Sequence, residues 1–174
     1  MSAKLPWFQR TWSFGFPVQL YPDILEPLRG TPARLGEAVR GLPSGILTRR
    51  EKPGTWSIQE NVGHLPDLEE LPLGRLEDYL AGKPTLRAAD LTNRKTHEAD
   101  HNGRPIATLL SGFRAARAKL MERLNALEEA DFARLAVHPR LKVSMRLVDM
   151  CLFQAEHDDY HLARIRELIR LFQG

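Results

Sequence analysis

This sequence of 174 residues has a single cysteine, no long apolar run and little net charge, and each of these absences excludes a class of protein. The single cysteine, Cys151, allows no disulfide within the chain, which is typical of a reducing compartment. No apolar run reaches the roughly 20 residues of a membrane-spanning helix, so we expect no membrane association. Lys and Arg total 25 against 22 Asp and Glu, and this net charge of +3 is spread along the chain. We therefore expect no nucleic-acid partner, which would need a clustered basic face.

The first 22 residues differ in composition from the rest of the chain. Residues 1–22 are rich in aromatic residues and proline, and proline blocks regular pairing, so the segment is predicted to be an extended arm. Its aromatic rings would be costly to leave in water, so we expect them to pack on the main body or on a partner subunit. The N-terminus lacks the apolar core of a signal peptide, and we therefore expect a cytoplasmic protein.

Apolar residues recur at helical spacing in four segments, while strand-like alternation and internal repeats are both missing. The predicted helices cover residues 23–42, 57–79, 105–127 and 145–172. Residues 82–104 are polar and irregular, and residues 130–143 form a further connection. With 43% hydrophobic residues the chain can bury a proper core. The prediction is a single all-α domain over residues 1–174, folded as a four-helix bundle.

Proline and capping residues predict boundaries within these helices. Thr31 is expected to cap a restart of the first helix, with Pro32 at the first position of the new segment. Ser57 and Glu60 form a capping box that begins the second helix. Pro66 and Pro72 lie within that helix. Each removes a backbone hydrogen bond, and each is expected to bend or break the helix.

Three histidines carry the most informative pattern. His157 and His161 are four residues apart on the apolar stripe of the last helix, and His64 lies among the apolar positions of the second. Three imidazoles from two helices can hold one divalent metal ion and leave a coordination position free, as catalytic sites do. Glu60 and Asp158 are candidates to bond the ring nitrogens that face away from the metal. The alternative is that these histidines are hydrogen-bonded core residues without a metal.

The remaining histidines, the cysteine and one arginine are weaker candidates. His97 and His101 have the same spacing among polar neighbours, so we expect them to be solvated or to order a loop. His138 precedes a proline and is expected to be a turn residue. Cys151 lies well off the face of the paired histidines and is predicted to be an inert core residue rather than a nucleophile. Arg75 lies beyond His64 on a similar face, where it would either meet an anionic substrate or lie at the surface.

Two motifs together resemble the DinB/YfiT-like superfamily of bacterial metal-dependent proteins. The motifs are Trp56-Ser57-x-x-Glu60-x-x-x-His64-Leu65 and Glu156-His157-Asp158-Asp159-x-His161-Leu162-Ala163. The resemblance implies a down-up-down-up bundle with a long second connection, and frequent homodimers. It also implies a divalent metal, nickel or zinc, on His64, His157 and His161.

The sequence departs from the family pattern at two places. Tyr160 stands where close relatives often carry another histidine, and Pro66 follows directly after the His64-Leu65 pair. These departures put the role of position 160 and the orientation of the His64 ring in question. The chain is also too short for the second catalytic domain of the sulfoxide synthases that include such a module, so we do not expect that activity.

Several functions fit the resemblance. Characterised relatives resemble thiol transferases, or isomerases that depend on a thiol, and a metal would lower the pKa of a low-molecular-weight thiol cosubstrate. We therefore expect thiol S-transfer to small electrophiles, with hydrolysis by an activated water as the alternative. Glu60 would be a candidate base in either case, although its capping role is a sufficient explanation. Two further alternatives are a non-enzymatic stress-response bundle and an interaction module that uses the aromatic arm.

Overall fold

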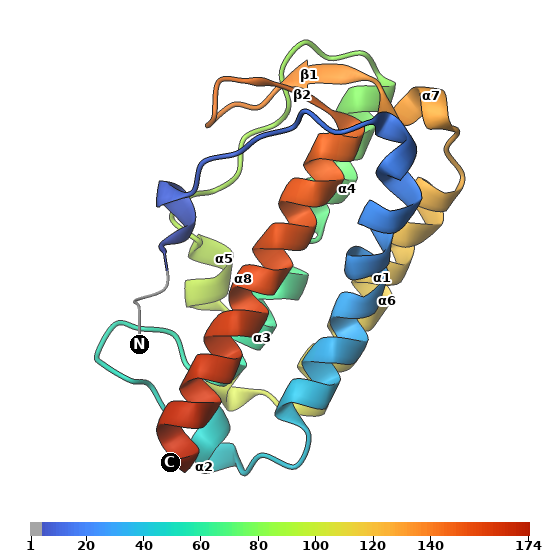
Figure 1. Ribbon diagram of the computed structural model, residues 1–174. Coiled ribbons are helices and arrows are strands. Elements are labelled where there is room, and N and C mark those ends of the chain that lie inside the picture. Colours follow the sequence, from blue (N-terminus) through green and yellow to red (C-terminus); the bar gives the residue numbers. More distant parts are fainter. Residues whose placement is uncertain (1–4) are drawn as a thin grey trace.

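The computed structural model describes residues 5–174 and shows a bundle built around four long helical segments (Figure 1). These segments are α1 (Tyr21–Val39), α3 (Ile58–Leu68) followed by α4 (Glu70–Leu80), α6 (Ile106–Asn125) and α8 (Leu147–Gln173). Helix α1 packs on α8 and α6, and α3 packs on α6 and α8. The predicted all-α four-helix bundle is therefore confirmed. In the described residues no helix is both long enough and apolar enough to cross a membrane.

Short elements lie in the N-terminal arm and in the connections between the long helices. They are η1 (Trp7–Gln9), η2 (Val18–Leu20), α2 (Ser44–Leu47), α5 (Arg94–Glu98), η3 (His101–Gly103), α7 (Glu129–Phe132), β1 (Leu135–Val137) and β2 (Ser144–Arg146). The two strands pair antiparallel, with Ala136 opposite Met145. These strands were not expected from the sequence, because three residues per strand are too few to show an alternating pattern.

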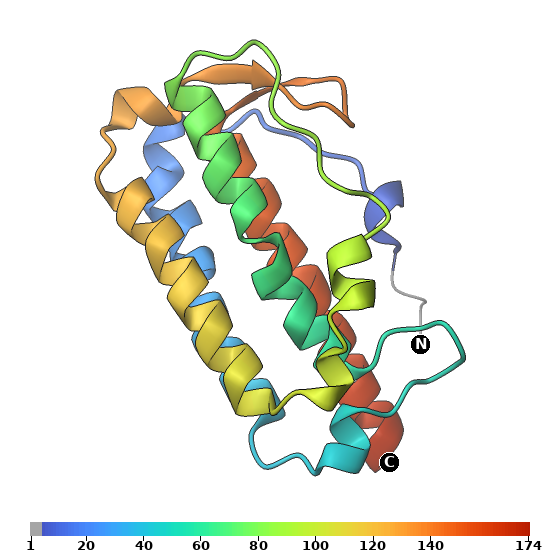
Figure 2. The same ribbon diagram turned by 180° about the vertical axis from the view of Figure 1, so that it is seen from behind.

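The order of helix directions differs from the alternating order that the family resemblance implied. In Figures 1 and 2, α1 and α8 run in one direction, while α3, α4 and α6 run in the other. The order is therefore down-up-up-down. The cause is the long second connection: after α4 the chain returns along the outside of the bundle through α5 and η3 before α6 begins.

The first helix runs through both of its interior prolines, Pro27 and Pro32, so the predicted restart at Thr31 is wrong. Pro32 has no N–H for the carbonyl of Leu28, and Nη1 of Arg117 donates to that carbonyl at 2.7 Å instead. Nη2 of Arg34 donates to the carbonyl of Pro27 at 3.1 Å. Side-chain donors thus satisfy carbonyls along this stretch, and the helix continues from Tyr21 to Val39.

The second helix begins and breaks as predicted. The Ser57 hydroxyl accepts from the backbone N–H of Glu60 at 3.0 Å, and the Glu60 carboxylate accepts from the backbone N–H of Ser57 at 2.8 Å. Helix α3 then ends at Leu68, two residues beyond Pro66, and α4 begins at Glu70. The early break leaves His64 in the last turns of α3, close to the start of the cavity described below.

The described part of the N-terminal arm packs on the body of its own chain. The ring of Trp7 is buried and lies 5.0 Å from the ring of Phe153 and 5.8 Å from that of Tyr160, between centroids. Two turns of 3-10 helix interrupt the predicted extended conformation. Of the predicted arm, residues 1–4 lie outside the described residues. The arm closes one side of the space between α8 and the second connection (Figure 1).

Candidate metal centre

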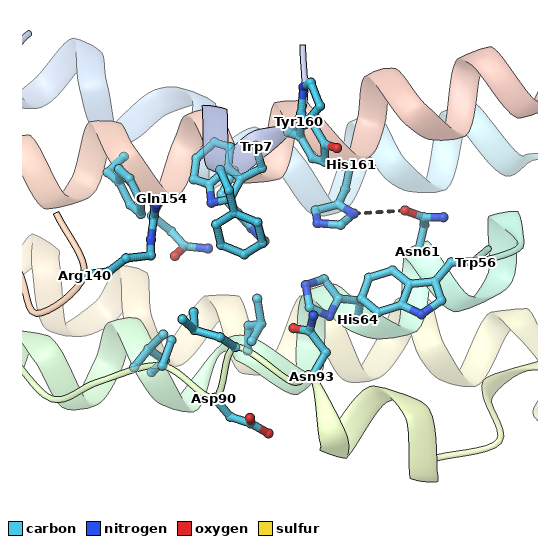
Figure 3. A pocket seen from close by; sticks show the side chains of 18 of the residues that line it. Trp7, Trp56, Asn61, His64, Asp90, Asn93, Arg140, Gln154, Tyr160 and His161 are labelled. Atoms are coloured by element: carbon cyan, nitrogen blue, oxygen red, sulfur yellow. Dashed lines mark hydrogen bonds between the residues drawn. The ribbon is translucent and has the colours of Figure 1, made fainter. Parts of the chain in front are cut away.

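The structure brings His64, His157 and His161 together across the interface of α3 and α8. One ring nitrogen from each histidine lies within 4.8 Å of the others. The ring centroids of His64 and His157 each lie 4.7 Å from that of His161. Figure 3 shows His64 and His161 facing the same space from opposite helices. Three imidazoles at this separation match the donor set that a divalent transition metal takes in proteins.

Hydrogen bonding fixes the tautomer of His161. Its Nδ1 lies 2.9 Å from Oδ1 of Asn61 (dashed line in Figure 3). The Asn61 amide nitrogen donates to the carbonyl of Ser57 at 2.7 Å, so its oxygen is the atom that faces the ring. An amide oxygen only accepts, and Nδ1 of His161 therefore carries the proton. The lone pair of a neutral ring is then on Nε2, where a metal can bind it.

A chain of hydrogen bonds fixes His64 in the same way. Its Nδ1 lies 2.9 Å from the hydroxyl of Thr96, and that hydroxyl donates to Oδ2 of Asp67 at 2.9 Å. Because the single hydroxyl proton goes to the carboxylate, the oxygen must accept from Nδ1 of His64. The lone pair is again on Nε2. Nε2 of His101 lies 2.8 Å from the same Asp67 oxygen and completes the chain.

The environment also keeps His64 neutral. Burial, with a contribution from the nearby His157, lowers the pKa of His64 to about 3. A protonated imidazole has no lone pair on either nitrogen for a metal. Because His64 is neutral at physiological pH, it can bind a metal ion.

The two carboxylates expected behind the histidines lie elsewhere, which corrects that expectation. Glu60 accepts from Ser57 and from Nε of Arg50, at 2.8 and 2.9 Å. Burial alone would raise the pKa of Glu60, but the bonds to Arg50 and Ser57 lower it overall. Asn61 and Thr96 bond the histidine rings in place of the expected carboxylates.

Asp158 belongs to a buried charge network on another face of α8. Its Oδ2 accepts from Nη1 of Arg117 at 2.7 Å and from the Thr31 hydroxyl at 2.9 Å. Arg117 also makes two bonds to Glu69. Burial alone lowers the pKa of Arg117, but Asp158 and Glu69 outweigh it and raise the pKa. This network joins α1, α6, α8 and the break between α3 and α4, so its role is to hold the bundle together.

His97 and His101, the second histidine pair of the sequence, differ in burial. His97 is exposed, as expected for a solvated residue. His101 is buried, and of the two expected alternatives it fits the ordering of a loop, because it ties the second connection to Asp67. Its ring lies directly over Gly63, where a Cβ would overlap it. A glycine beside His64 was the signal in the sequence that another side chain approaches the helix there.

The predictions for Cys151 and His138 are confirmed, and one alternative for Arg75 is wrong. Cys151 is buried, and burial raises its pKa to about 12, so it is not a nucleophile. Nδ1 of His138 accepts from the backbone N–H of Leu141 at 3.1 Å and so orders the turn of the hairpin. Arg75 is buried, not at the surface.

A cavity of about 700 Å³ opens beside the three histidines. Its wall is formed by the arm, residues 54–56, α3, α4, α8, the second connection and the hairpin (Figure 3). The aromatic residues that line it are Trp7, Phe8, Trp56, Phe153 and Tyr160. Tyr160, at the first departure from the family pattern, therefore forms part of the wall. The volume is sufficient for a small molecule.

The geometry agrees with the comparisons to known proteins. The family model of the DinB superfamily matches residues 28–165, so the chain belongs to this superfamily. Two relatives, from Geobacillus thermodenitrificans and Geobacillus kaustophilus, carry provisional names as metal-dependent hydrolases. They are 28% and 29% identical over 150 and 152 residues, which is 84% of this chain and 82% of each relative.

Two solved structures share the fold. YfiT from Bacillus subtilis, described provisionally as a metal-dependent hydrolase with an unusual four-helix bundle topology, aligns with a TM-score of 0.80 and 22% identity over 94% of both chains. The mycothiol-dependent maleylpyruvate isomerase aligns with a TM-score of 0.65 and 9% identity, over 85% of this chain and 60% of that chain. At these identities the two alignments establish the fold alone.

Proposed function

We propose that the protein is a metal-dependent enzyme in which His64, His157 and His161 hold one divalent ion, nickel or zinc. The observation that carries the proposal is the arrangement of the hydrogen bonds behind the rings. Asn61 and the Thr96–Asp67 pair place the lone pairs of two histidines on Nε2. Partners of this kind orient the ligands in known metal sites.

Three protein ligands leave a coordination position for a small molecule, and the cavity gives access to it. When bound there, a divalent metal would supply Lewis-acid activation by lowering the pKa of a nucleophile, either a thiol or a water. The chain itself contributes the orientation of the rings and an aromatic wall that restricts water. The size of the cavity favours a small-molecule substrate over the alternatives of a purely structural bundle or an interaction module.

Thiol S-transfer to a small electrophile is the reaction that the lining favours. Hydrolysis commonly needs a general base beside the activated water. Among the described residues that line the cavity, the only carboxylate is Asp90, which accepts from Thr92 and from the backbone N–H of Arg94. A thiol has a pKa of about 8.5 and needs only a modest lowering to become the thiolate. Hydrolysis is the second candidate, supported by the names of the two Geobacillus relatives.

The two reactions are distinguished by one pair of assays on the metal-loaded protein. Monochlorobimane with cysteine or glutathione reports thiol transfer, and p-nitrophenyl acetate without a thiol reports hydrolysis. We expect transfer that His161→Ala abolishes and that the control Arg114→Gln, which changes an exposed residue of α6 away from the cavity, retains. Ester hydrolysis lost in His161→Ala, with no thiol transfer in the wild type, would favour the second candidate. Equal rates in both variants would overturn both.

Two expectations about assembly and location remain proposals. A homodimer and a cytoplasmic location follow from the sequence and the family resemblance. The packing of the arm on its own chain means that a dimer need not use Trp7, so light scattering of the wild-type protein is the direct measurement of the assembly.

A further inference from the structure

A second group of nitrogen atoms lines the same cavity away from the three histidines. These nitrogen atoms belong to Arg75 of α4 and to His138 and Arg140 of the hairpin. Figure 3 shows Arg140 across Trp7 from His64 and His161. The three residues come from segments far apart in the sequence, so the fold has brought them to one place.

Arg75 is a buried cation without a carboxylate. Its side chain is 4% exposed, and its Nε donates to the backbone carbonyl of Arg87 at 3.1 Å. Within the described residues no acidic side chain pairs with it, whereas the buried Arg117 pairs with two. Burial lowers the pKa of Arg75 to about 10, so the guanidinium still carries its charge at neutral pH. A buried charge of this kind needs a counterion.

His138 presents a donor toward Arg75. Its Nδ1 accepts the backbone N–H of Leu141, and burial lowers its pKa to about 4, so the ring is neutral with its proton on Nε2. That Nε2 lies 3.3 Å from Nη1 of Arg75, which is also only a donor. Two N–H groups cannot bond each other. Both can donate to one acceptor that lies within hydrogen-bond distance of the two nitrogens.

Arg140 adds a third donor. Its Nη2 is buried and has no hydrogen-bond partner among residues 5–174. Its guanidinium lies over the rings of Phe8 and Phe153, at 5.1 and 5.9 Å from their centroids. The carboxylates near Arg164 do not neutralise this group, because Glu51 and Glu167 both pair with Arg164. The carboxylate of Asp90 accepts from residues of its own turn.

We propose that Arg75, His138 and Arg140 form an oxyanion subsite for the carboxylate or phosphate of a small molecule whose apolar part lies against Trp7 and Phe153. Guanidinium groups bind both oxyanions strongly because their donors match the acceptor geometry. The other end of such a molecule extends toward the three histidines. This assignment deepens the proposed function by naming the substrate class, and it rests on that function only for the reacting end.

Binding of matched probes tests the subsite without the metal. The full chain is titrated in EDTA with 3-phenylpropanoate, with the neutral 3-phenylpropanamide and with phenyl phosphate, using calorimetry. A charge-assisted hydrogen bond is worth enough to favour the anion by about tenfold or more. We therefore expect a lower dissociation constant for an anionic probe than for the amide, and the stronger of the two anions identifies the group.

Variants test which residues cause the preference for the anionic probe over the amide. Arg140→Gln removes a charge from a half-buried side chain, and His138→Asn keeps an acceptor for Leu141 while it removes the Nε2 donor. Both should reduce the ratio of anion to amide affinity by about tenfold. The control Arg114→Gln removes the same charge from an exposed site on α6 and should leave the ratio unchanged.

Three outcomes would overturn the subsite. They are equal affinity for acid and amide in the wild type, a preference that survives in both variants, and a preference that arises only with metal and is lost in His161→Ala. The last result would mean that the anion binds the metal. Failure of the proposed metal function gives a different pattern, because the anion preference in EDTA would then persist while no metal binds.

Discussion

The hydroxyl of Thr96 is the single group whose removal tests most sharply how His64 is held. It accepts from Nδ1 of His64 and donates to Asp67, both at 2.9 Å. Thr96→Val keeps the shape of the side chain and removes both bonds. Without the hydroxyl, the protein loses the group that fixes the proton on Nδ1 and the lone pair on Nε2.

The expected magnitude follows from the burial of these groups. His64 is 2% exposed and Thr96 is 5% exposed, so little water is available to replace the lost bonds. A buried donor left without an acceptor costs about 1–3 kcal/mol. Substitutions behind metal ligands commonly lower metal affinity by about 10–100-fold. We expect the dissociation constant of Thr96→Val for zinc or nickel to rise by about this factor.

Competition with a chromogenic chelator measures the affinity, and Thr92→Val is the matched control. Thr92 lies on the same connection, but it is exposed and its hydroxyl donates to Asp90. Nitrogen-15 NMR of the metal-free wild type should also show the proton of His64 on Nδ1. Metal affinity in Thr96→Val equal to that of the wild type, or a proton on Nε2 in the wild type, would refute the reasoning.

Three further predictions concern stability. Gly63→Ala should lower both the melting temperature and the metal affinity, because its Cβ would overlap the His101 ring; calorimetry and chelator competition measure the two effects, and an unchanged protein would contradict them. Asp158→Asn should cost about 3 kcal/mol in urea denaturation with unchanged metal stoichiometry, because it weakens the Arg117 network; loss of metal would instead place Asp158 behind the ligands. The pKa of His64 is about 3 when folded and about 6.5 when unfolded, so the unfolded chain binds the extra proton between these values. Above pH 6.5 His64 is neutral in both states and its protonation does not favour unfolding. As the pH falls, protonation of His64 in the unfolded chain favours unfolding, so the unfolding free energy of the metal-free protein should decrease from pH 7 to 5. We expect a smaller decrease in His64→Gln.

The sequence predicts the helices because their signals are local. The capping box of Ser57 and Glu60 and the apolar stripes require only neighbouring residues, and both are confirmed. The restart at Thr31 failed because the donor that rescues the proline-interrupted helix is Arg117, which lies 89 residues from the carbonyl it bonds. No local pattern carries such information.

In the candidate site, too, the sequence predicted what depends on neighbouring residues and missed what depends on contacts between distant ones. The i,i+4 pair His157 and His161 is visible on a helical wheel, and the structure places both beside His64. The polar partners of the rings were missed, because Thr96 reaches His64 from a connection whose path depends on the whole fold. Of the proposed anion subsite, the sequence indicated only Arg75, as one of two alternatives. His138 and Arg140 were missed because they line the same cavity as Arg75 only once the chain has folded.

The central proposal, a metal on the three histidines, is tested most directly by the metal content of the purified protein. Mass spectrometry would compare the wild type with His161→Ala and with the control His97→Ala. We expect about one nickel or zinc ion per chain in the wild type and the control, and none in His161→Ala. An equal metal content in His161→Ala, or no metal in the wild type after reconstitution with nickel and zinc, would contradict the proposal.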